Sequence, residues 1–354
     1  MRLSVKPGNP AERLALALGL VPEPVVLVFL GLGLARTTIA AARLGVFDAL
    51  GDADRAAPDL AGDLGCDAAA LEPLLAALNG FGLLRHRAGR YRNRKVVQRW
   101  LRRDSGRSVL DVVLLIGDLD ERFSTLAETV RSGRIARLHD TPQSEAFWGR
   151  YMRALGMAAR FVGPEVARRV RVDRPPGRLL DVGGGHGQYA VALCKRWPGL
   201  QAEVLELPEA VPHGEAMVAE AGFGDRVRFR PGDMRTADWG EGYDLVTLFN
   251  VLHNATEPEA VDAVRRAFAA LRPGGRLVIL DAEHATPTGD RSATAGFNEL
   301  FFFVLSGAQA WPEATMRRWM ADAGFVGVRQ TRLFTLPEVM LTGQRPTEAL
   351  SVSR

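Results

Sequence analysis

The sequence predicts an α/β protein: an open parallel sheet with helices on both faces, preceded by a largely helical region. After the linker "RPPG" at 174–177, short β-rich runs alternate with helical segments, which is typical of such a sheet. Before the linker, the apolar residues recur at helical spacing, apart from one short hairpin. The first β-rich run ends in a turn made mostly of glycine, "LLDVGGGHG" at 179–187, where an α/β sheet of this kind meets its ligand.

Length and composition indicate an ordinary two-domain protein. The chain has 354 residues, 47% hydrophobic and 24% charged. Its two cysteines, Cys66 and Cys194, are far apart, so no disulfide framework and no metal site is indicated, and a cytoplasmic location is expected. The most apolar run, at 25–35, is shorter than the roughly 20 residues that span a bilayer. We therefore expect a buried helix there and no membrane partner.

The N-terminal region has the pattern of a winged helix. A helix is expected over 24–50 with Gly51 as its stop, a second begins near Pro58, and a third follows Asp67 as N-cap. Two extended runs then flank the Ala88–Gly89 turn. Residues 108–172 are expected to be helical throughout.

Six strands are expected after the linker. They are the runs "RLLDVG", "AEVLEL", "VRFRPG", "YDLVTLFNVL", "RLVILDA" and a final "VGVRQTRLF".

The glycines predict a close approach between backbone and ligand. Gly183, Gly185 and Gly187 follow Asp181 at two-residue intervals, and glycine allows positive φ and close contact without a Cβ clash. A dinucleotide fingerprint requires glycine at position 188, which is Gln188 here, so a dinucleotide dehydrogenase is disfavoured. A purely structural turn could use the same glycines, so other residues must decide.

Acidic residues at the next two strand ends indicate a nucleoside. Glu206 ends the second strand about 20 residues past the glycines, where a carboxylate accepts ribose hydroxyls. Asp233 and Met234 follow the third strand, where they could bind an adenine amino group and pack on the ring. No Lys or Arg of these turns is expected to hold phosphate. The set describes an adenosine-like ligand without a pyrophosphate.

A series of ordered motifs then carries a family resemblance. "LLDVGGGHG", "LELPEAV", "PGDM", "VLH" and "LRPGGRLVILD" occur in this order, with His253 after the fourth strand. Over nearly its whole length the chain resembles the S-adenosylmethionine-dependent small-molecule O-methyltransferases of the plant caffeate and bacterial polyketide-tailoring type. The resemblance implies a Rossmann-like class I methyltransferase domain and a winged-helix dimerisation domain. It also implies a homodimer whose N-terminal domains interlock, each contributing to the partner's pocket, and a role in secondary metabolism such as antibiotic biosynthesis.

The resemblance assigns roles to residues and segments. It implies His253 as general base and Asp281 as the carboxylate that orients it, although Glu283 is an alternative orienter. The expected domains are a dimerisation domain at 1–107, a helical connector at 108–175 that contributes to the acceptor pocket, and the methyltransferase domain at 176–354. The expected cofactor residues are Asp181, Gly183, Gly185, Glu206, Leu207, Asp233, Met234 and Asn250.

The acceptor pocket is expected to be aromatic. The candidate residues are Trp148, Met152, Phe297, Asn298, Phe301 and Phe302. Each could instead belong to the core, but together they suggest a flat aromatic acceptor.

Three departures from the family pattern leave the reaction open. The usual "HDW" is "HNAT" here, Ala310 stands where plant members carry a second Glu near the base, and Phe249 replaces a Lys. These changes keep methylation of carbon or nitrogen, and a non-methylating relative, as alternatives to O-methylation.

A cluster of basic residues raises the possibility of DNA binding. Residues 85–107 carry ten Arg or Lys against one acid, Asp104, and lie where the wing of a winged helix contacts phosphates. The helix that would read bases offers only Glu72 and Asn79 among many Ala and Leu. We therefore expect no nucleic-acid partner.

Overall fold

The computed structural model describes residues 4–282, 293–334 and 338–347. The chain divides into two compact units, Met1–Asp120 and Glu121–Arg354. The division lies within the segment 108–175 that the sequence assigns to a connector.

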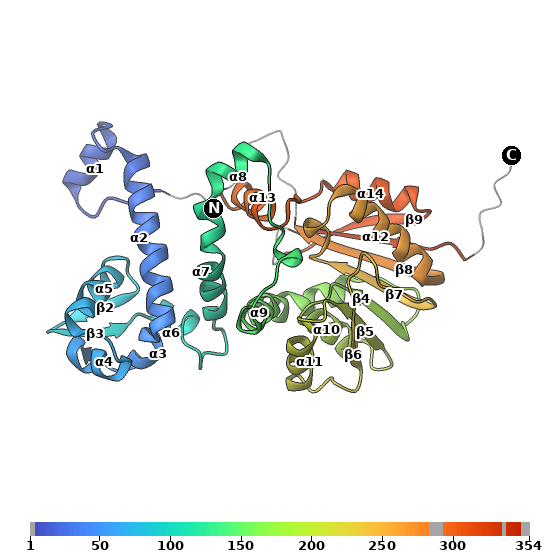
Figure 1. Cartoon of the computed structure of the whole chain (residues 1–354), viewed down its shortest axis with the longest axis horizontal. Helices are drawn as coiled ribbons and strands as arrows, with labels where there is room; N and C mark the ends of the chain where they lie inside the picture. The colour runs from blue at the N-terminus through green and yellow to red at the C-terminus, as the bar shows by residue number, and fades with distance from the viewer. Residues whose placement is uncertain (1–3, 283–292, 335–337, 348–354) are drawn as a thin grey trace. The chain divides into compact units, whose positions relative to one another are not determined.

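The first unit is a winged helix with a small sheet of order β1-β3-β2 (Figure 1). Its elements are α1 (Pro10–Ala17), α2 (Glu23–Leu44), α3 (Val46–Leu50), β1 (Arg55–Ala56), α4 (Ala57–Leu64), α5 (Ala68–Gly80), β2 (Leu84–Arg87), β3 (Arg90–Asn93), α6 (Lys95–Trp100) and most of α7 (Leu110–Ser124). Asp67 caps α5 by accepting from the Ala70 N–H at 2.8 Å, as predicted. The hairpin turns at Ala88 and Gly89, both with positive φ.

The long N-terminal helix differs from the prediction in two ways. It ends at Leu44, because Gly45 adopts a left-handed conformation (φ 78°), and α3 then begins. Its N-terminal half is not buried, which corrects the expectation for 25–35: Val28 is 72% and Phe29 74% exposed. By length and composition alone, α2 is also apolar enough to cross a membrane.

The basic cluster is partly neutralised by acids from outside it. Arg85 and Arg92 contact Asp54 at 3.4 and 3.1 Å. Arg102 pairs with Asp52 at 3.0 Å. The net positive charge of this surface is therefore smaller than the count over 85–107 suggests.

The second unit begins with helices that are not continuous, contrary to the prediction for 108–172. After α7, α8 (Leu126–Ser132) ends at Gly133, whose φ is 65°. A non-helical stretch containing the 3-10 turn η1 (Leu138–Asp140) follows, and α9 (Glu145–Arg169) starts at the N-cap Ser144.

A seven-stranded sheet of order β6-β5-β4-β7-β8-β10-β9 forms the centre of the second unit. The elements are β4 (Arg178–Val182), α10 (Gln188–Arg196), β5 (Gln201–Glu206), α11 (Val211–Glu220), β6 (Val227–Pro231), β7 (Tyr243–Phe249), η2 (Leu252–Asn254), α12 (Glu257–Ala270), β8 (Leu271–Ala282), α13 (Ala293–Ser306), α14 (Glu313–Asp322), β9 (Val326–Arg332) and β10 (Glu338–Gln344). The strand β10 was missed by the sequence analysis. It lies antiparallel between β8 and β9, so the sheet is mixed rather than wholly parallel.

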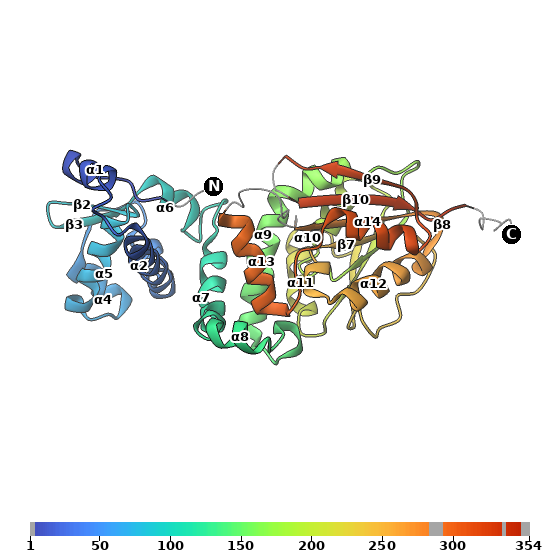
Figure 2. The same ribbon diagram turned by 90° about the horizontal axis from the view of Figure 1, so that it is seen from above.

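Helices cover both faces of this sheet (Figures 1 and 2). One face packs on α12 and α14 through a cluster that includes Leu248 and Ile279. The other packs on α9 and α10 through a cluster that includes Leu245 and Leu280. Because β4 to β8 are parallel, their carboxyl ends share one edge, where the first residue of antiparallel β10 also lies.

Candidate active site

The glycine turn after β4 requires glycine at several positions. Gly183, Gly185 and Gly187 have φ values of 65°, 51° and 67°, which other residues rarely adopt. A Cβ on Gly183 would lie 2.6 Å from Val251, and one on Gly184 would overlap the Asp181 carboxylate. Val251 and the Asp181 carboxylate therefore pack directly against the turn and leave no room for larger side chains at Gly183 and Gly184.

Asp181 lies beneath the turn. Its exposed fraction is 0%, and its Oδ1 accepts from the Thr247 hydroxyl at 2.6 Å. Burial raises the pKa of Asp181 to about 7. The Asp181 side chain supports the turn from the interior of the protein. It can therefore affect ligand binding only by fixing the conformation of the turn.

Glu206 links the ends of β4 and β5. Its Oε2 accepts from the Gly185 N–H at 2.7 Å and its Oε1 from the Leu207 N–H at 2.8 Å. Burial raises the pKa of this carboxyl, and the two backbone N–H groups oppose that effect. A carboxylate accepts about four hydrogen bonds, so Glu206 keeps capacity for two ligand hydroxyls.

Asp233 carries a partner that the sequence analysis did not foresee. The Arg235 Nε lies 3.0 Å from both oxygens of Asp233, and its Nη2 lies 2.8 Å from Asp140 Oδ1. The Arg235 guanidinium holds the pKa of Asp233 below its usual value. Met234 is partly buried against the core, next to Asp233. Asp233 is thus a fixed carboxylate at the third strand end.

Asn250 connects the glycine turn to the segment that follows β7. It has a positive φ of 53°, and its N–H donates to the Leu280 carbonyl at 2.7 Å. Its Nδ2 lies 3.4 Å from the hydroxyl of Tyr189, in the first turn of α10. The strained backbone points to a functional constraint here.

His253 and Asp281 form a pair at this edge. His253 Nδ1 lies 2.6 Å from Asp281 Oδ1. Asp281 Oδ2 accepts from the backbone N–H groups of Leu252 and His253 at 2.9 and 3.2 Å. Asp281 is 0% exposed, so the carboxylate fixes both the imidazole and the turn η2 that carries it. Glu283, the alternative orienter, lies outside the described residues.

Two aromatic residues contact His253 or the turn η2 that carries it. The Phe302 ring of α13 stacks on the His253 ring with 4.1 Å between centroids. Trp311 Nε1 donates to the Leu252 carbonyl at 3.0 Å. Ala310, which replaces the second Glu of plant members, is 1% exposed and adds no charge.

A second histidine, missed by the sequence analysis, lies close to the first. His139 sits in η1, and its Nε2 is 3.2 Å from the hydroxyl of Tyr151. Burial, and then the proximity of His253, lower the pKa of His139 to about 4, so its ring is neutral. Arg137 fixes η1 over η2, because it binds Glu259 at 2.9 Å and the Asn254 carbonyl at 2.8 Å.

The predicted acceptor residues fall into three groups. Phe302 lies on His253, whereas Phe297 and Phe301 stack on Phe123 at 5.7 and 5.9 Å, and Asn298 is exposed. Trp148 and Met152 pack with Ala210 and Met217. A Cβ on Gly185 would lie 3.5 Å from the Met152 sulfur, so Met152 borders the glycine turn.

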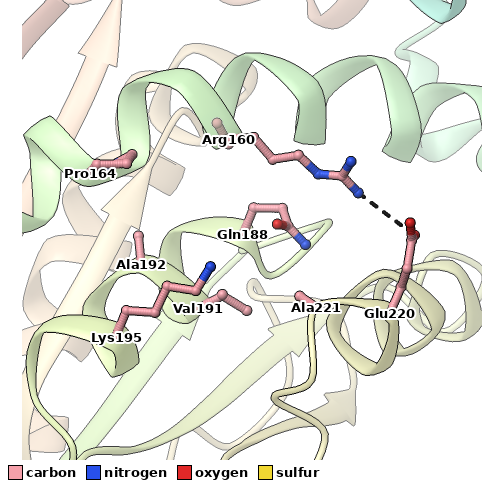
Figure 3. A pocket seen from close by; sticks show the side chains of 9 residues that line it. Arg160, Pro164, Gln188, Val191, Ala192, Lys195, Glu220 and Ala221 are labelled. Carbon is pink, nitrogen blue, oxygen red and sulfur yellow. Dashed lines mark ion pairs between the residues drawn. The ribbon is translucent and has the colours of Figure 1, made fainter. Parts of the chain in front are cut away.

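A hollow of about 340 Å³ on the helical surface is separate from these residues (Figure 3). Its lining comes from α9, α10 and α11, and Arg160 pairs across it with Glu220 at 3.7 Å. None of the strand-end residues described above lines this hollow. Gln188, which directly follows Gly187 of the glycine turn, does line it.

Comparisons with known proteins identify both units. The family model of the O-methyltransferase domain matches residues 123–326, and that of the O-methyltransferase dimerisation domain matches 29–103. Among curated relatives, the L-tyrosine C(3)-methyltransferase of Streptomyces lavendulae is 30% identical over 76% of each chain. The O-demethylpuromycin-O-methyltransferase of Streptomyces alboniger is 28% identical over 84% of this chain and 81% of the relative. The structure of human N-acetylserotonin methyltransferase with S-adenosylmethionine superposes with a TM-score of 0.81 at 22% identity, covering 97% of this chain and 100% of that one.

Proposed function

The chain belongs to the family of S-adenosylmethionine-dependent O-methyltransferases, and we propose that it methylates a hydroxyl group of a small aromatic acceptor with His253 as general base. The observation that carries this proposal is the 2.6 Å contact between His253 Nδ1 and Asp281, at the sheet edge that also holds the glycine turn.

The residues at this edge suit the cofactor. The glycine turn admits a ligand against the backbone, Glu206 keeps free acceptor positions for ribose hydroxyls, and Asp233 with Met234 suits the adenine. Leu207 and Asn250 border the same place. When bound there, S-adenosylmethionine supplies a methyl group that is already activated by its positive sulfur.

His253 is arranged to remove a proton from the acceptor. Since Nδ1 bears the hydrogen that Asp281 binds, the lone pair lies on Nε2, which takes the hydroxyl proton. The charge that develops on the imidazole is balanced by the buried Asp281 carboxylate. Phe302 keeps the ring in place by stacking on it.

His139 and Tyr151 suit the recognition of a second polar group on the acceptor. The neutral ring of His139 uses Nε2 for Tyr151, and its Nδ1 has no partner among the described residues. Trp148 contributes an aromatic ring beside it, with 6.2 Å between centroids. These groups favour a flat acceptor with more than one hydrogen-bonding substituent.

The exposed apolar half of α2 suits a second copy of this chain. The dimerisation model includes most of this helix, and its exposed side chains Val28 and Phe29 would be costly to leave in water. We therefore assign a homodimer through the N-terminal unit rather than a membrane, in a cytoplasmic enzyme of secondary metabolism.

Methylation of an aromatic carbon is a second candidate. The relative that is 30% identical is named for methylating C3 of L-tyrosine, and this chain departs from the usual motif after the base with Asn254 and Ala255. A base that deprotonates a phenol also makes the neighbouring ring carbon nucleophilic, so His253 could serve either reaction.

Locating the transferred label decides between the two. The enzyme would be incubated with methyl-labelled S-adenosylmethionine and a panel of hydroxyaromatics that includes L-tyrosine. Label on oxygen supports the O-methyltransferase, label on a ring carbon supports the second candidate, and cofactor binding without transfer to any acceptor argues for a non-methylating relative.

A further inference from the structure

Two buried carboxyl oxygens at the sheet edge, Asp181 Oδ2 and Glu338 Oε2, have no hydrogen-bond partner among the described residues. Oε2 of Glu338 is inaccessible to solvent and accepts no hydrogen bond. Glu338 as a whole is partly buried, but an inaccessible carboxyl oxygen without a donor is unfavourable and calls for an explanation.

The strand register places Glu338 beside the catalytic pair. Glu338 is the first residue of β10 and pairs with Ala282, the neighbour of Asp281. Side chains alternate along a strand, so Glu338 points to the same face as Met340, which packs in the cluster with Tyr189 and Phe249. Glu338 therefore lies at the carboxyl edge, on the side of the sheet where α10 begins.

The charged groups around Glu338 come from three elements. Asp281 of β8 and His253 of η2 both act on its charge, and Glu338 acts on the hydroxyl of Tyr189 of α10. Burial, followed by the nearby Asp281, raises the pKa of Glu338 to about 7. No cation of the described chain pairs with this carboxyl.

The proposed cofactor site extends toward Glu338. Its adenosine is assigned to Glu206 and Asp233, whereas its methyl group must reach the acceptor at His253. If the cofactor binds in this way, the residues nearest its amino-acid end would be those between the glycine turn and η2, such as Tyr189 and Asn250, which contact each other. This part of S-adenosylmethionine carries two positive charges, the sulfonium and the α-ammonium, and one negative charge, the α-carboxylate, so its net charge is positive.

We propose that Glu338 is the carboxylate that binds the cationic end of the cofactor, and that cofactor binding displaces its proton. The proton passes to solvent, and the carboxylate forms an ion pair with the bound cation. This inference rests on the cofactor dependence of the proposed function, but it involves neither the acceptor nor methyl transfer.

Calorimetry in buffers with different ionisation enthalpies tests the proposal. The free carboxyl is about half ionised at pH 7, so binding of S-adenosylmethionine, which carries both positive charges, should release about half a proton per site. Affinity should increase about tenfold from pH 5.5 to 7 as the carboxyl ionises. Comparison with variants assigns the released proton to Glu338 or to another group.

Three variants separate the possible causes. Glu338→Gln should abolish most of the proton release and flatten the pH dependence, while Glu338→Asp, which restores a carboxyl, should release a proton. Glu220→Gln removes an exposed carboxyl on α11 and should behave as the unaltered enzyme. Thermal melting checks that each variant is folded.

Two ligands distinguish the two positive charges. Release with both S-adenosylmethionine and S-adenosylhomocysteine assigns the pairing to the α-ammonium, and release with S-adenosylmethionine alone assigns it to the sulfonium. If Glu338→Gln releases as many protons as the unaltered enzyme, or if the unaltered enzyme releases none with either ligand between pH 6 and 7, the proposal is wrong. Methyl transfer to an acceptor could still occur in that case, so failure here is distinguishable from failure of the proposed function.

Discussion

Apolar side chains are usually buried and charged side chains are usually exposed. The two units of this chain depart from this pattern in opposite ways. In the N-terminal unit, large apolar side chains of α2 such as Phe29 are exposed. In the C-terminal unit, Asp181, Glu206 and Asp281 are buried at the carboxyl edge of the sheet. Both units also contain apolar cores.

Each exception indicates a different kind of partner. An exposed apolar helix gains free energy when a protein surface covers it, whereas buried carboxylates gain when a polar ligand or a neighbouring donor satisfies them. The comparison therefore assigns assembly to the first unit and cofactor chemistry to the second. Substitutions in each unit test the two assignments separately.

The largest effect is expected at the proposed catalytic pair, His253 and Asp281. His253→Ala should lower the rate of methyl transfer about 10²- to 10⁴-fold, because the acceptor loses its general base. Binding of S-adenosylhomocysteine, measured by calorimetry, should change little, and His86→Ala in the exposed hairpin should leave the rate unaltered. Undiminished transfer by His253→Ala would show that another group removes the proton.

The next effect concerns assembly through α2. Phe29→Glu puts a charge into the apolar face and should weaken the dimer by about 3 kcal/mol, or roughly 10²-fold in Kd. Analytical ultracentrifugation gives the dissociation constant, and Val326→Glu, at an exposed valine of β9, is the matched control. A chain that is monomeric without any substitution and sediments with lipid vesicles would instead favour a membrane surface as the occupant of α2.

A smaller effect is expected at the cofactor turn. Gly183→Ala forces a positive φ on alanine and brings Cβ to 2.6 Å from Val251. We expect strain of about 1–3 kcal/mol and a cofactor affinity about tenfold lower. Gly199→Ala is the control, since nothing lies within 4 Å of its Cβ and its φ is not positive. Equal cofactor affinities of the Gly183→Ala and Gly199→Ala variants would show that the turn is not part of the binding site.

The smallest effect is expected for an exposed ion pair in the C-terminal unit. The side chains of Arg131 and Glu128 form an ion pair at 2.6 Å while remaining 72% and 68% exposed. Arg131→Gln should change the free energy of unfolding by less than about 0.5 kcal/mol, because water screens such pairs. Chemical denaturation measures this value, and a loss above about 1 kcal/mol would show that exposed polar contacts matter here as much as buried ones.

The sequence predicted those features that depend on local pattern. The winged helix, the six strands, the Asp67 cap and the turn after β4 follow from periodicity, capping and glycine spacing. The family was expected from the ordered motifs, and the family models confirm it.

Features that depend on distant segments were not predictable in this way. The strand β10 lies antiparallel between β8 and β9, so its pairing, and with it the position of Glu338, is decided by tertiary structure. His139 lies in a stretch that was expected to be helical, and its proximity to His253 depends on the contacts of Arg137. The exposure of α2 was not predictable either, because a single sequence shows that a helix is apolar but not what covers it.

The most direct test of the cofactor assignment is a crystal structure with bound S-adenosylhomocysteine. We predict that the ribose hydroxyls bind the Glu206 carboxylate, that the adenine lies beside Asp233 and Met234, and that the sulfur points toward His253. A nucleoside bound in another cleft, with Glu206 contacting only the Gly185 and Leu207 N–H groups, would contradict the assignment of the buried edge to the cofactor.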